Sequence, residues 1–125
     1  MFENTDITAT VAVKDLAEAR KFYEGTLGLK QVAAEGDEVV VYRSGKSTLN
    51  VYRSEYAGTN QATALTWVVG NDVAGVVRKL KDKGVEFEHY DLPGMKRQGD
   101  LHVGGHVKTA WFKDPDGNIL SIVNG

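Results

Sequence analysis

The sequence predicts an α+β fold in which two βαβββ modules form a half-barrel around a central cavity. The first observation behind this prediction is a repeat: the same order of strand and helix patterns occurs twice, with the helix-capping Asp15 matched by Asp72. The second is that each repeat has a single helix, which covers one face of its sheet, so the other face must enclose a cavity or meet apolar material. We expect one domain over residues 1–125, with module one at about 5–56 and module two at about 62–124.

The first module begins with a strand over residues 8–13, where small or polar residues alternate with apolar ones. Asp15 then predicts a helix N-cap with Glu18 in the capping-box position, and Gly28 predicts the end of that helix. Three further strands are expected at residues 30–34, 38–42 and 48–52, the last two joined by the turn Ser44-Gly45-Lys46.

The second module repeats this order. A strand over residues 64–69 precedes a helix that Asp72 caps and Gly84 ends. Strands are then expected at residues 85–89, 107–113 and 118–123, with the turn Asp114-Pro115-Asp116-Gly117 between the last two. Turn chemistry accounts for this pair of carboxylates better than catalysis does.

Residues 91–106 are predicted to form a long glycine-rich loop. Loops of this length tend to be lids or binding loops, so the sequence leaves open whether this one covers the cavity mouth or only connects two strands. His102 and His106 within it are expected to be solvated, and His89 is expected at the surface.

Strand alternation assigns side chains to the helix or to the cavity. In the first module Val11 and Val13 face the helix, while Thr10 faces the cavity. In the second module Leu65 and Trp67 are placed on the helix side. Counting back from the helix cap Asp72, as from Asp15 in the first module, would instead place them on the cavity side. Trp111 is expected to face inward and Phe112 to lie in the core. The predicted ligand-binding residues are Thr8, Thr10, Asn50, Tyr52, Thr66, Trp111 and Ser121.

The composition excludes several classes of protein. With 42% hydrophobic and 26% charged residues the chain is globular rather than disordered, and a net charge of −2 leaves no large basic patch for nucleic acid or an anionic membrane. The absence of cysteine removes disulfides and thiolate metal sites. No signal peptide and no apolar run of about 20 residues is present, so we expect a cytoplasmic protein that is not bound to a membrane.

Two stretches carry a family resemblance: DLAEARKFYEGTLGLK at residues 15–30 and FKDPDGNIL at residues 112–120. The chain resembles the vicinal oxygen chelate superfamily, which contains glyoxalase I, bleomycin-resistance proteins and extradiol dioxygenases. The resemblance covers nearly the whole sequence. It implies the glyoxalase-like half-barrel and assembly as a homodimer, but not one activity, because members include lyases, dioxygenases and drug-binding proteins.

The resemblance also implies four positions at which metal-dependent members carry ligands. In this sequence they hold Thr8, Asn50, Ser121, and Ala64 or Leu65 depending on the register. None is a histidine or a carboxylate, and an amide with hydroxyls cannot offset the dehydration of Zn²⁺, Ni²⁺ or Fe²⁺. We therefore expect no metal at the usual site and no cofactor.

The sequence favours metal-independent binding of a small aromatic or amphipathic molecule, such as sequestration of a drug or toxin of the bleomycin-resistance type. The alternative is a glyoxalase-like lyase or dioxygenase with a metal relocated to His102 and His106 in the 99–106 loop, or a metal-free isomerase. A third reading is a degenerate domain that mainly dimerises. No residue is assigned a catalytic role, because no general acid and base pair with credible geometry is visible.

Overall fold

The computed structural model describes residues 1–125 and confirms the α+β fold with two βαβββ modules. The chain divides into two compact units, Met1–Thr59 and Asn60–Gly125. That these units form one domain with a cavity between the modules stays a prediction.

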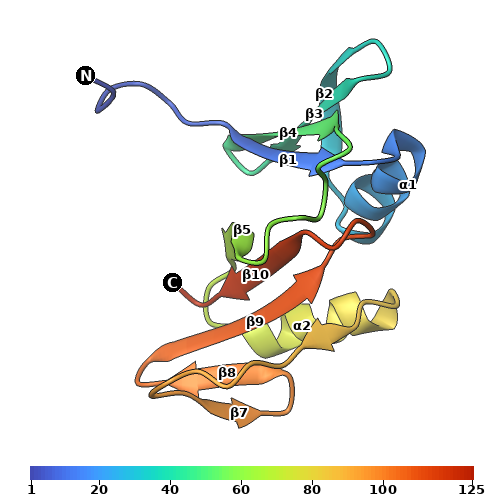
Figure 1. Ribbon diagram of the computed structural model, residues 1–125. Coiled ribbons are helices and arrows are strands. Elements are labelled where there is room, and N and C mark those ends of the chain that lie inside the picture. The colour runs from blue at the N-terminus through green and yellow to red at the C-terminus, as the bar shows by residue number, and fades with distance from the viewer. The chain divides into compact units, whose positions relative to one another are not determined.

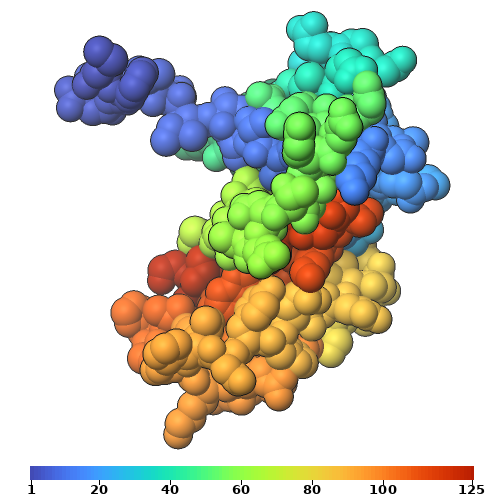
Figure 2. All heavy atoms as spheres, viewed as in Figure 1, coloured from blue at the N-terminus to red at the C-terminus, as the bar shows by residue number.

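The first unit is a four-stranded sheet in the order β1-β4-β3-β2 with one helical segment (Figure 1). Its elements are β1 (Ala9–Val13), α1 (Leu16–Arg20), η1 (Lys21–Thr26), β2 (Lys30–Glu35), β3 (Val39–Ser44) and β4 (Ser47–Arg53). β1 pairs in parallel with β4, and the other neighbours are antiparallel. One face of β1, β3 and β4 is buried, through Val11, Val13, Val40, Tyr42, Leu49 and Val51. The residues that precede β1 are all exposed and extend away from the sheet, as Figure 2 shows in dark blue.

The first helix begins as predicted but changes its winding. The Asp15 carboxylate accepts hydrogen bonds from the Ala17 and Glu18 backbone N–H groups at 2.8 and 3.3 Å. After one turn the helix widens into the π-helical segment η1, in which the Leu27 N–H group donates to the Phe22 carbonyl at 2.9 Å. The predicted end at Gly28 is confirmed, because this residue has a φ of 74°.

Tyr42 of β3 joins the sheet to this helix. Its ring stacks on Tyr23 with centroids 6.1 Å apart, and its hydroxyl donates to the Glu24 carboxylate at 2.7 Å. Burial, together with this hydrogen bond, raises the pKa of the Tyr42 hydroxyl well above its ordinary value of 10.0.

The pKa of the Tyr42 hydroxyl is higher in the folded chain than in the unfolded chain. The protonated hydroxyl therefore contributes its full stabilisation below about pH 10, and this stabilisation is lost as the pH rises further. We expect Tyr42→Phe to lower the free energy of unfolding at neutral pH by about 1 kcal/mol. The same variant should lose less stability than the wild-type chain between neutral pH and about pH 11. Urea denaturation of both proteins across this range measures the effect, and an identical pH dependence in both would contradict it.

The second unit contains β5 (Thr63–Val68), α2 (Val73–Asp82), β6 (Phe87–Glu88), β7 (Lys96–Gln98), β8 (Leu101–Gly104), β9 (Val107–Lys113) and β10 (Ile119–Val123). Its strands follow the order β5-β10-β9-β8-β7, and β6 also pairs with β9. The strands β5, β10, β9 and β6 therefore repeat the order of the first sheet, and the hairpin β7–β8 is an addition to it. β6 is shorter than the predicted strand over residues 85–89.

The prediction of a loop over residues 91–106 is wrong in this respect, because β7 and β8 form a hairpin within it. β8 in turn pairs with β9. A two-residue turn joins β7 to β8, and another joins β8 to β9. Each turn begins with a glycine at positive φ, Gly99 at 62° and Gly105 at 58°. The turn between β3 and β4 is built in the same way on Gly45, with a φ of 59°. Glycine at the first central position is typical of tight hairpin turns, because other residues are strained there.

The helix α2 contacts β9 and lies along the second sheet (Figure 1). Asp72 caps it as predicted, accepting a hydrogen bond from the Gly75 N–H group at 3.2 Å. Gly84 ends it with a φ of 90°, and the Gly84 and Val85 N–H groups bond the carbonyls of Lys81 and Leu80. Neither α1 nor α2 combines the length and the hydropathy that a membrane-crossing helix needs.

Candidate functional site

Three of the predicted ligand-binding residues share the open face of the first sheet. Thr10 is the register partner of Asn50, and Ala12 is the partner of Tyr52, so their side chains leave the sheet on the side opposite the buried valines. Asn50 is half-buried, and Tyr52 is 39% exposed. Thr8 lies one residue before β1, is exposed, and shares a hydrogen bond of 3.3 Å with Thr48 through the two hydroxyls.

The other three predicted residues lie together on the second sheet. Ser121 of β10 is the register partner of Thr66 on one side and of Trp111 on the other. The Thr66 and Ser121 hydroxyls are hydrogen-bonded at 2.6 Å. The Trp111 indole N–H donates to the hydroxyl of Thr63 at 3.0 Å. Thr63 is not among the predicted ligand-binding residues.

The opposite face of this sheet is the core. Phe112 is buried, and its register partner is the buried Leu120. Leu65 pairs with Leu120 and Trp67 with Ile122, which places both on the core side. The structure thus agrees with the assignment of Thr66 to the open face, and with the assignment of Trp111 and Phe112 to opposite faces.

His102 also belongs to the open face, and the expectation that it is solvated is wrong. It is the register partner of Thr109, two residues before Trp111, and only 1% of it is exposed. Its ring meets the Trp111 indole edge to face, with centroids 4.8 Å apart. Tyr90 completes the cluster: the centroid of its ring lies 5.3 Å from that of Trp111 and 6.2 Å from that of His102. We call the side chains of Thr66, Tyr90, His102, Trp111 and Ser121 the Trp111 face.

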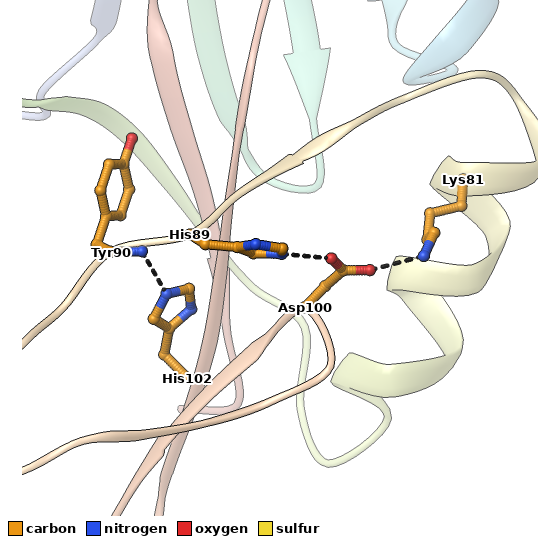
Figure 3. Close-up of polar contacts among 5 residues, drawn as sticks. All are labelled: Lys81, His89, Tyr90, Asp100 and His102. Carbon is orange, nitrogen blue, oxygen red and sulfur yellow. Dashed lines mark hydrogen bonds and ion pairs between the residues drawn. The ribbon is translucent and has the colours of Figure 1, made fainter.

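One ring nitrogen of His102 is engaged by the backbone (Figure 3). The Tyr90 N–H group donates to His102 Nε2 at 3.0 Å, just beyond the end of β6. The histidine therefore bridges β8 to the segment after β6, where no strand pairing joins them. His102 Nδ1 is buried and has no hydrogen-bond partner.

A separate ion-pair cluster lies beside this histidine (Figure 3). The Asp100 carboxylate accepts from Lys81 Nζ of α2 at 2.8 Å and pairs with His89 Nε2 at 2.8 Å. The hydrogen bonds from Lys81 and then from His89 lower the pKa of the Asp100 carboxyl below its ordinary value. This cluster holds the hairpin turn at Asp100 against α2, and the expected exposure of His89 is confirmed.

The residues at the four positions implied for metal ligands do not fit a metal ion. Thr8 and Ser121 supply hydroxyls that are bonded to other hydroxyls, and Asn50 supplies a single amide. The alternative site in the 99–106 segment finds no support either. His106 lies exposed in the β8–β9 turn, and His102 Nε2 is occupied by the Tyr90 N–H group. No group of three or more histidine or carboxylate side chains is arranged to hold a metal.

The first unit also has a groove of about 470 Å³ next to the start of α1, away from the predicted site residues. Its lining residues are Lys14, Asp15, Leu16, Ala17, Arg20, Asp37, Glu38 and Arg53. Two of the cations are already paired, Arg53 with Glu38 at 3.0 Å and Arg20 with Glu24 at 3.5 Å. The groove is therefore a place where surface charges neutralise each other, and we assign no ligand to it.

Comparison with known proteins identifies relatives of this architecture. A family model described as Glyoxalase/Bleomycin resistance protein/Dioxygenase superfamily matches residues 7–122. No curated protein matches the chain.

Among solved structures, a glyoxalase family protein from Enterococcus faecalis is similar with a TM-score of 0.74 and 17% identity, covering 98% of this chain and 99% of that one. A lactoylglutathione lyase from Agrobacterium tumefaciens has a TM-score of 0.72 and 15% identity, with 97% and 94% covered. A fosfomycin resistance protein from Listeria monocytogenes, in complex with Mn(II), has a TM-score of 0.70 and 14% identity, with 97% and 90% covered. At these identities the likeness shows the fold alone.

Proposed function

Because the chain belongs to the Glyoxalase/Bleomycin resistance protein/Dioxygenase superfamily, we propose that it binds a small aromatic or amphipathic organic molecule without the help of a metal ion. The observation that carries this proposal is the Trp111 face. It combines the half-buried rings of Tyr90 and Trp111 with the paired hydroxyls of Thr66 and Ser121. Apolar surface with a few placed polar groups is the usual make-up of a small-molecule site.

The donor chemistry separates this chain from a relative that is solved with Mn(II). Hydroxyl and amide oxygens bind divalent transition metals far more weakly than imidazole or carboxylate groups do. Binding without turnover suits sequestration of a drug or toxin. Thr8, Thr10, Asn50 and Tyr52 of the first unit, the cavity between the modules and the homodimer remain parts of this proposal.

The test uses the fluorescent probe 8-anilinonaphthalene-1-sulfonate, which is aromatic and amphipathic. We expect saturable binding to the native wild-type chain, with energy transfer from tryptophan to the probe. Trp111→Ala should weaken binding on the order of tenfold, because it removes the largest aromatic surface of the site.

Trp67→Ala is the matched control, since it removes the other tryptophan from the opposite face of the same sheet. Its affinity should stay close to that of the wild type under conditions where circular dichroism shows both variants folded. Absence of saturable binding, or equal weakening by both substitutions, would refute the proposal. Loss of binding after treatment with a chelator, restored by one equivalent of Mn²⁺ or Zn²⁺, would refute its metal-independent part.

A further inference from the structure

His102 carries a hydrogen-bond donor that nothing in the chain satisfies. Its Nε2 atom accepts from the Tyr90 backbone N–H group, so the proton of the neutral imidazole must be on Nδ1. This Nδ1–H group is buried and has no hydrogen-bond partner, and Figure 3 shows Nδ1 on the side of the ring that points away from Tyr90. Buried donors are rarely left without an acceptor, because the unmet hydrogen bond is destabilising.

The surroundings of this group define what it can bind. The Trp111 indole stands edge to face with the imidazole, with ring centroids 4.8 Å apart, and the Tyr90 ring lies beside both, at 6.2 Å from the imidazole and 5.3 Å from the indole. An acceptor that reaches Nδ1 therefore arrives on a molecule that also meets aromatic rings.

We propose that the Nδ1–H group of His102 donates a hydrogen bond to the molecule bound on the Trp111 face, and that this molecule is an aromatic compound with a carbonyl or carboxylate oxygen next to its ring. This inference rests on the proposed function and narrows its ligand class. The inference gives His102 a role in ligand recognition. This role replaces both the solvated state expected from the sequence and the metal-ligand role that the alternative lyase or dioxygenase function would require. Thr66 and Ser121 do not fill this role, because Ser121 donates its hydroxyl proton to the Leu65 carbonyl at 3.4 Å and Thr66 donates its own to Ser121.

The first test needs no ligand. Long-range ¹H–¹⁵N spectra of the histidine side chains should show His102 as a neutral imidazole protonated on Nδ1. Protonation on Nε2 would overturn the inference, because the Tyr90 N–H group would then lack its acceptor and Nδ1 would be no donor.

The second test compares acetophenone with ethylbenzene, which have similar shapes and differ in the carbonyl oxygen. We expect the wild-type chain to bind acetophenone about three- to tenfold more tightly, as a neutral hydrogen bond provides. Acetophenone should also shift the His102 Nδ1–H resonance. His102→Phe should bind both compounds equally, whereas His102→Gln should restore part of the preference, because a glutamine amide can accept from Tyr90 and donate to the ligand.

His106→Phe is the control, since His106 is an exposed histidine in the neighbouring turn, and it should keep the full preference. Equal binding of both compounds by the wild type would overturn the role of His102 and leave the proposed function standing. A Nδ1–H resonance moved upfield by the Trp111 ring and insensitive to acetophenone would also overturn it, by identifying the indole as the acceptor. If neither compound nor the naphthalene sulfonate bound, both the role of His102 and the proposed function would fall.

Discussion

Phe112→Ala is expected to lower the free energy of unfolding by about 3–5 kcal/mol, as truncation of a buried phenylalanine usually does. Only 1% of Phe112 is exposed, and its ring meets the Phe87 ring at 5.7 Å. Its register partner Leu120 has no exposed surface. The cavity left by the missing ring would lie on the core side of the sheet, where α2 contacts β9, and cannot collapse without moving the helix or a strand. Urea denaturation followed by circular dichroism gives the change in midpoint and in slope.

The adjacent residue supplies the control for this prediction. Trp111→Ala removes a larger ring from the same strand, but from the half-buried open face. It should therefore cost less than about 2 kcal/mol, since its surroundings can relax and water can enter. The two variants should exchange their order in probe binding, where Trp111→Ala has the larger effect. A greater loss of stability from Trp111→Ala would mean that the two faces of β9 are assigned the wrong way round.

The repeat in the sequence contained most of the information about the fold. Asp15 and Asp72 cap the two helices, and Gly28 and Gly84 end them, because these signals depend on neighbouring residues alone. Strand parity could also be predicted, since alternation assigns every second side chain to one face. The change from α1 to η1 had no such local signal.

The hairpin β7–β8 was missed because its strands are short and polar. Lys96–Gln98 is exposed throughout and has no apolar alternation, so pattern reading gives no strand there. A signal was nevertheless present in the dipeptides Gly99-Asp100 and Gly105-His106, which have the glycine-first form of a tight hairpin turn. The same signal predicts the turn at Gly45, but the many glycines of residues 91–106 favour a loop there instead.

The candidate site was predictable only in part, because one of its residues lies on the hairpin β7–β8 that the sequence pattern does not indicate. Thr66, Trp111 and Ser121 could be placed on one face by counting along long strands. His102 could not, because its position depends on the hairpin and on a pairing between β8 and β9. Its burial arises from Tyr90 and Trp111, which lie 12 and 9 positions away along the chain, and composition alone gives no sign of such a contact.

Asp114→Ala is expected to lower the free energy of unfolding by about 2–4 kcal/mol, although this residue lies in a turn. Only 5% of this residue is exposed, and its carboxylate is the acceptor for three groups. Oδ1 accepts from the backbone N–H groups of Asp116 and Asn118, both at 2.9 Å, and Oδ2 accepts from the Asn118 amide at 2.8 Å. Asn118 is itself buried, so alanine would leave its backbone N–H group and its side-chain amide without this acceptor.

The turn joins β9 to β10, which carry the core residue Phe112 and the open-face residues Trp111 and Ser121. Asp114→Ala should therefore lower stability strongly and probe affinity with it, whereas Trp111→Ala should lower probe affinity with a smaller loss of stability. Asp37→Ala is the matched control, because it removes an exposed aspartate from the β2–β3 turn, and it should change stability by less than about 0.5 kcal/mol. Asp114→Asn keeps one acceptor oxygen and should fall between the two. If Asp114→Ala were as stable as Asp37→Ala, the carboxylate would not be what holds the turn. The backbone bonds from the Asp114 N–H to the Asn118 carbonyl and from the Gly117 N–H to the Asp114 carbonyl would then suffice on their own.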